Sequence, residues 1–144
     1  MAIIILLIVV AVVIALDLGG LLHGPEGGSG GPIVFAHAGD RWTIGGTVYR
    51  ATSFTTSENG TFRGNFSVEG VASTIIIVLM NESEEENFTN NTTGLVGFYD
   101  SGPASVGQLN VTVAPAGVYY FYAYNPNTNT VTVDWQTAAE FVPG

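Results

Sequence analysis

Hydrophobic and polar positions divide the chain into three parts. The first part opens with Met1–Leu16, a run that contains no polar side chain. It is followed by a stretch rich in glycine and proline, residues 23–32 (HGPEGGSGGP), and from Ile33 onward apolar and polar residues alternate over short segments. The pattern therefore predicts an apolar segment over residues 1–22, a hinge over 23–32 and a folded domain over 33–144.

The alternation after Ile33 predicts β-strands. A period of two is typical of half-buried strands in antiparallel sheets, and it is clearest over residues 61–70, 108–113 and 128–135. Two further segments, 74–80 and 118–124, are apolar or aromatic on both faces. They fit either central strands covered on both sides or strands whose outer face meets a neighbouring subunit. We expect a single antiparallel β-sandwich, Ig-like or jelly-roll-like.

The apolar segment can be interpreted in two ways. Nine of the twelve residues over 3–14 are β-branched, which favours a strand. Its length and its lack of alternation favour an α-helix, and a helix that is apolar on every side must be surrounded by lipid or by other helices. We expect a helix over residues 1–22, which makes the fold class α+β. Its contacts with other helices are expected to come from Ile3, Ile4, Ile5, Leu6, Leu7, Ile8, Val9, Val10, Val12, Val13, Ile14 and Leu16.

Glycines and prolines are expected to let the domain reorient relative to this segment. The first glycine pair interrupts the apolar run, and the others fall in the hinge. The hinge residues predicted on this basis are Gly19, Gly20, Gly24, Pro25, Gly27 and Gly28.

Composition excludes several classes of function. The net charge of -9 cannot neutralise nucleic-acid phosphates. The chain has no cysteine, so disulfides and thiol chemistry are excluded. Charged residues make up only 10 % of the chain while hydrophobic residues make up 47 %, so hydration must come largely from something other than ionic side chains.

Glycans attached at N-glycosylation sequons are expected to provide that hydration. The motif Asn-x-Ser/Thr occurs at seven of the ten asparagines, and all of them lie in the predicted domain. Such density predicts an extracellular surface covered by N-linked glycans, with no other cofactor and no metal. Four sequons fall in the polar stretch 81–93, which is expected to be an exposed loop. The seven acceptors are Asn59, Asn65, Asn81, Asn87, Asn90, Asn91 and Asn110.

Residues that could support catalysis are few. The two histidines, His23 and His37, lie in the hinge and near the first strand, and no nucleophile elbow, zinc-protease motif or phosphate-binding loop is present. The glutamates of the stretch 81–93 are expected to be solvated, or at most to form a weak cation site. The aromatic run 119–124 is expected to pack in the core rather than to bind carbohydrate. We predict that the protein is not an enzyme.

The order of apolar segment, hinge and sequon-rich β domain resembles a mature archaeal type IV pilin or the related archaeal flagellin. The resemblance implies a short basic leader that a prepilin peptidase removes just before the apolar run. Bacterial pilins carry glutamate at the fifth mature position, whereas this chain has Ile5, which fits the archaeal members better than the bacterial ones. The stretch PAGVYYFYAYNPNTNTVTV (115–133) also looks like jelly-roll domains of archaeal surface proteins.

We therefore expect a structural subunit of an extracellular pilus that serves adhesion or surface attachment. Its partners would be copies of itself in a helical homopolymer, together with the peptidase and the assembly machinery in the membrane. One alternative is a membrane-anchored cell-surface binding domain. The other is a donor-strand filament in which residues 3–14 complete a neighbour's sheet.

Overall fold

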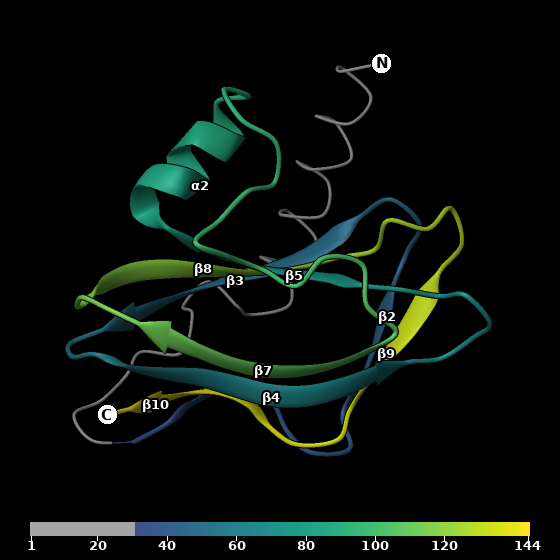
Figure 1. Cartoon of the computed structure of the whole chain (residues 1–144), viewed down its shortest axis with the longest axis horizontal. Helices are drawn as coiled ribbons and strands as arrows, with labels where there is room; N and C mark the ends of the chain where they lie inside the picture. Colours follow the sequence, from purple (N-terminus) through teal and green to yellow (C-terminus); the bar gives the residue numbers. More distant parts are fainter. Residues whose placement is uncertain (1–30) are drawn as a thin grey trace, which may run out of the picture.

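The computed structural model describes residues 31–144 (Figure 1). Strands dominate it, and they are joined by short turns and one helix. In chain order the elements are β1 (Ile33–Ala36), β2 (Arg41–Ile44), β3 (Tyr49–Thr56), β4 (Gly60–Val68), β5 (Ile76–Asn81), α2 (Glu82–Thr89), β6 (Tyr99–Asp100), β7 (Val106–Val113), β8 (Gly117–Tyr124), β9 (Val131–Trp135) and β10 (Ala139–Pro143).

The strands form two antiparallel sheets that face each other (Figure 1). The smaller sheet has the order β3-β8-β5-β6. In the larger sheet β4 is central, because it pairs with β7 along one side and with both β10 and β9 along the other. The pairing with β10 ends at Arg63 and the pairing with β9 begins at Phe66, so the sheet forks beside Gly64 and Asn65. The fork leaves a hollow on the outer face of the larger sheet, lined in part by Asn65 and Asn110.

Aromatic rings from both sheets fill the space between them. Phe62 of β4 stacks on Phe121 of β8 with ring centroids 5.1 Å apart, and Trp42 meets Trp135 edge to face at the same centroid distance. Each buried aromatic side chain removes about 150–250 Å² of its surface from water. Burial of apolar surface stabilises the folded state by about 25 cal/mol per Å². Residues 33–141 thus supply a continuous core of their own.

The predicted α+β class is wrong. Strands account for 54 % of the structure and helix for 7 %, and the sheets curl into a half-barrel shape, so the fold is mostly β. Within residues 31–144 the one helix is the short, polar α2, and none is long and apolar enough to span a membrane. The helix predicted over 1–22 and most of the hinge lie outside the described residues, as do all the polymerisation and hinge residues named above.

The stretch 81–93, predicted as a loop, contains the helix α2. Asn81 caps it, because its side-chain oxygen accepts a hydrogen bond from the Glu84 backbone at 2.9 Å. The Glu84 carboxylate returns a bond to the Asn81 N–H, also at 2.9 Å, which completes a capping box. Acidic side chains in the first turn also complement the helix dipole. The polarity of the stretch conceals this start signal.

The helix and the residues after it cover the outer face of the smaller sheet. Phe88 of α2 packs against Tyr49 of β3 and Tyr122 of β8, with ring centroids 6.0 and 5.6 Å apart. Leu95 joins the same cluster. Of the two explanations left open for the apolar outer faces, coverage by the protein's own chain holds for this part of the sheet.

Candidate functional site

In the part of the chain that the structure describes, the histidine and acidic side chains do not gather at a metal centre. His37 is exposed, and its closest acidic partner is Asp40, whose carboxylate also accepts the His37 backbone N–H at 2.8 Å. His23 lies outside the described residues. Within residues 31–144, no three histidine or acidic side chains gather closely enough to hold a metal ion.

The glutamates of α2 are engaged by the protein itself. Besides capping the helix, Glu84 accepts the backbone N–H of Phe98 at 3.2 Å. Glu85 lies 3.5 Å from the hydroxyl of Tyr122, and partial burial raises the pKa of its carboxyl above the usual range. Two of the four carboxylates thus hold α2 against the sheet, which leaves them unsuited to a cation site.

The aromatic run 119–124 divides between the two faces of β8, as its alternation requires. Tyr119 and Phe121 point into the core, while Tyr120, Tyr122 and Tyr124 belong to the outer cluster beneath α2. Burial, together with the nearby Glu85 carboxylate, raises the pKa of Tyr49 in the same cluster to about 12. The run is a packing element.

This burial predicts a loss of stability at alkaline pH. Because the pKa of Tyr49 rises from 10.0 to about 12 on folding, the unfolded chain ionises first and the stabilisation disappears across that interval. The free energy of unfolding should fall by roughly 2–3 kcal/mol from this group, at about 1.4 kcal/mol per pKa unit. Chemical denaturation at stepped pH measures it. Tyr49→Phe should make the decline shallower by this amount, while Tyr122 and Tyr120, whose pKa values burial also raises, maintain the remainder. An unchanged decline would refute the assignment.

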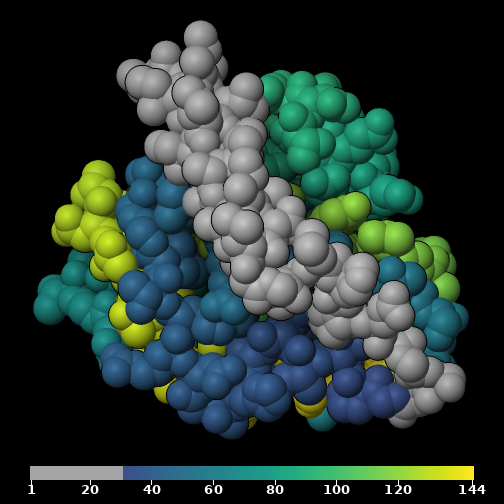
Figure 2. Space-filling model, turned by 180° about the vertical axis from the view of Figure 1, so that it is seen from behind, coloured from purple at the N-terminus to yellow at the C-terminus, as the bar shows by residue number. Residues whose placement is uncertain are grey.

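The sequon asparagines lie at the surface. Asn59, Asn87, Asn90, Asn91 and Asn110 are exposed, and the other two are partly exposed. α2 stands out as a projection above the sheets (Figures 1 and 2), and four of the acceptors lie at its ends or along it. The other three lie on the larger sheet or its turn, namely Asn59, Asn65 and Asn110.

Two of the three asparagines outside sequons serve the fold instead. Asn125 is fully buried, and its side-chain nitrogen lies 2.8–3.0 Å from the backbone oxygens of Ile44, Gly45 and Asn129. Asn127 donates to the backbone oxygen of Thr74 at 2.7 Å. Apart from Asn81, whose side chain caps α2, the sequon asparagines are surface groups, while Asn125 and Asn127 form a turn and Asn129 is exposed outside a sequon.

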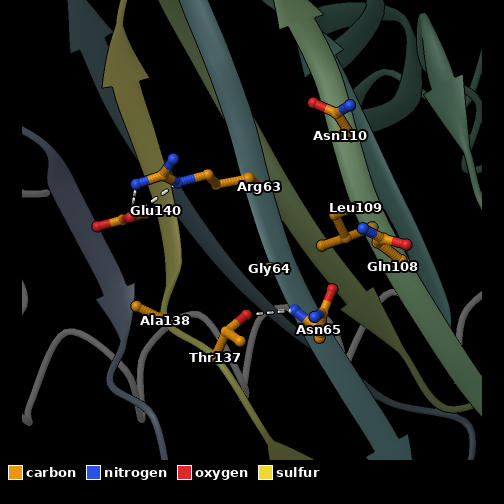
Figure 3. Close-up of a pocket in the computed structure, with 9 residues that line it drawn as sticks. All are labelled: Arg63, Gly64, Asn65, Gln108, Leu109, Asn110, Thr137, Ala138 and Glu140. Atoms are coloured by element: carbon orange, nitrogen blue, oxygen red, sulfur yellow. Dashed lines mark hydrogen bonds and ion pairs between the residues drawn. The ribbon is translucent and has the colours of Figure 1, made fainter.

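Asn65 and Asn110 share a polar hollow on the outer face of the larger sheet (Figure 3). The hollow has a volume of about 430 Å³ and lies at the fork, where the corner between β9 and β10 leaves β4. Arg63 forms one wall through two bonds to the same oxygen of Glu140, at 2.8 and 2.9 Å. The lining residues are Arg63, Gly64, Asn65, Gln108, Leu109, Asn110, Thr137, Ala138 and Glu140.

No protein-family model matches the sequence, and no curated protein matches it either. Function must therefore be inferred from the residues themselves.

The chemistry of the hollow suits a polyhydroxylated group. Three primary amides, one hydroxyl and an ion pair offer donors and acceptors side by side, and carbohydrate hydroxyls need both. The lining holds no aromatic ring on which a free sugar could stack, yet two of its amides are themselves glycan acceptors. The sequons mark these two asparagines in the sequence, whereas no linear motif marks Gln108, Thr137 or the Arg63–Glu140 pair.

Proposed function

We propose that this chain is a structural subunit of an extracellular filament. The apolar segment 1–22 joins the subunits in the interior of the filament, and the β domain (residues 33–144) forms its glycosylated outer layer. The filament serves adhesion or surface attachment. The observation that carries the proposal is the contrast between a bare apolar segment and a domain that presents every one of its sequon asparagines at its surface.

The β domain has the properties that an outer layer needs. Its core is filled by its own aromatic side chains, so it can be displayed without a partner to complete it. Its sequon asparagines project from a helix, a turn and the face of the larger sheet. Glycans at these positions would hydrate a domain that carries few charges, which supports exposure to the medium.

The apolar segment supplies the association energy. If each copy hides on the order of 1,500 Å² of apolar surface, about 25 cal/mol per Å² gives a gross stabilisation of tens of kcal/mol before ordering costs. Contacts that run head to tail without closing on themselves produce helical polymers. Burial of this segment among copies of itself would make assembly effectively irreversible.

Two alternatives use the same segment differently. As a membrane anchor it is short, because sixteen uninterrupted apolar residues fall below the roughly twenty that a hydrocarbon core requires. As a donated strand, residues 3–14 would instead add to an exposed sheet edge of a neighbouring subunit.

Electron microscopy with an antibody against the β domain tests the proposal. Fibres that label along their whole length, sheared from the surface of the source cells, are the expected result. Label restricted to the cell envelope, with no labelled fibres, would support the membrane-anchored alternative and overturn the filament.

A further inference from the structure

We propose that Asn110, and not Asn65, carries the glycan at the fork, and that the first sugar of this glycan is seated in the hollow against Asn65 and Gln108. This inference rests on the proposed function, since it requires an extracellular glycoprotein. It assigns one acceptor of a pair that the sequence presents as equivalent, and it gives the hollow a ligand.

The two acceptors compete for the same space. In the register of β4 and β7, Arg63 faces Asn110 and Asn65 faces Gln108. Asn65 and Asn110 are therefore diagonal neighbours on one face, at about 7–8 Å in such sheets. Both line the hollow (Figure 3). Two glycans starting here would place their first sugars in one hollow.

Asn65 is held too firmly to serve as the acceptor. Its backbone N–H donates to the Thr137 hydroxyl at 2.9 Å, and its carbonyl accepts the backbone N–H of Gln136 at 2.8 Å. The next residue, Phe66, is fully buried, and β4 is paired on both sides. Ser67, the third residue of the Asn65 sequon, accepts a hydrogen bond at its hydroxyl from the Gln136 side chain at 3.3 Å. Freeing this sequon would open the middle of the sheet.

Asn110 is easier to reach. Among the described residues β7 pairs with β4 alone, and both Asn110 and Thr112 of its sequon are exposed. Local opening of an edge strand breaks one ladder of hydrogen bonds rather than two, so it costs less free energy. Opening β7 alone removes Leu109 and Val113 from the core, but it leaves β4 paired with β9 and β10. A transferase can therefore reach the Asn110 sequon with less unfolding than the Asn65 sequon requires.

The transfer itself is a substitution at the anomeric carbon of a lipid-phosphate-linked oligosaccharide. The Nδ2 atom of Asn110 forms a bond to that carbon, and the bond from the carbon to the phosphate oxygen breaks. The electron pair leaves with the lipid phosphate, and the proton lost from the amide passes to a base on the transferase or to solvent.

The hollow then holds the attached sugar. The amides of Asn65 and Gln108 can both donate and accept hydrogen bonds. The Thr137 oxygen accepts the Asn65 N–H, so its own hydrogen is available to donate. One oxygen of Glu140 binds Arg63 and the other remains as an acceptor. A volume of about 430 Å³ lies within the range of small-ligand sites, about 300–1,000 Å³.

Glycopeptide mass spectrometry of the protein from its source cells tests the assignment, with Asn110→Gln and Asn65→Gln as a matched pair. We expect Asn110→Gln to lose one glycan and Asn65→Gln to lose none. A glycan on Asn65, alone or beside one on Asn110, overturns the inference. Glycans on other sequons but on neither of these two also overturn it and leave the proposed function standing. A chain without any glycan overturns both.

Hydrogen–deuterium exchange tests whether the first sugar of the Asn110 glycan lies in the hollow. In the glycosylated protein the amides of β7 should exchange several-fold more slowly than in Asn110→Gln. Gln108→Ala, which keeps the glycan, should lose part of this protection, while Thr43→Ala, exposed on β2, should keep all of it. Equal exchange with and without the glycan would show that the sugar does not rest in the hollow.

Discussion

Replacing both Ile8 and Val12 by aspartate is expected to abolish filament assembly while leaving the β domain folded. In the filament each carboxylate would be transferred from water into an apolar core without a partner, and such a transfer costs several kcal/mol or more per charge. The cost recurs in every subunit. Electron microscopy of sheared cell-surface material measures the loss of fibres, and the fluorescence of the buried Trp42 and Trp135 reports the fold of the domain.

The apolar pair Ile8→Val and Val12→Ile is the control. It keeps the hydrophobicity of the segment, so fibres should form as in the unmodified protein. Fibres of normal number and length from the aspartate variant would show that the segment is not buried in the filament. Loss of the domain's thermal transition would instead show that the segment is needed for folding.

Asn125→Ala is expected to cause a large loss of stability in the β domain, although it changes no apolar core residue. The side chain ties the end of β2, at Ile44 and Gly45, to the turn before β9, and its oxygen accepts the backbone N–H of Asn127 at 2.9 Å. Alanine would leave buried polar groups without partners, at about 1–3 kcal/mol for each. We expect the free energy of unfolding to fall by about 3–5 kcal/mol in a urea titration.

Asn129→Ala is the matched control for this prediction. Its side chain is exposed, and only its backbone oxygen contacts Asn125. Its unfolding midpoint should stay close to that of the unmodified protein. A loss below about 1 kcal/mol for Asn125→Ala, within the range of surface substitutions, would contradict the structural role assigned to this asparagine.

Local alternation in the sequence predicted several strands. Residues 61–68 of the first predicted segment lie in β4, which ends two residues before the predicted boundary, and all of 108–113 lies in β7, because apolar and polar residues alternate there. The segment 128–135 begins later than predicted, at Val131, because the network around Asn125 holds the preceding residues in a turn. The helix α2 was missed, since its start signal lies among sequons and acidic residues that also suit a loop.

Only the two sequon asparagines of the candidate site could be predicted from the sequence. A sequon is a linear motif, so Asn65 and Asn110 can be found by reading the chain. Arg63 and Glu140 are 77 residues apart, and nothing local indicates that they pair. The fork depends on β4 changing partners from β10 to β9, which is a property of strand register. Register is fixed by long-range packing, which no short segment encodes.

Helical reconstruction of the sheared fibres by cryo-electron microscopy tests the central claim most directly. We expect density for residues 1–22 packed around the filament axis, with the β domains outside and sugar density on asparagines that face the medium. Fibres whose axis is formed by another protein, or in which residues 3–14 complete a neighbour's sheet, would contradict it.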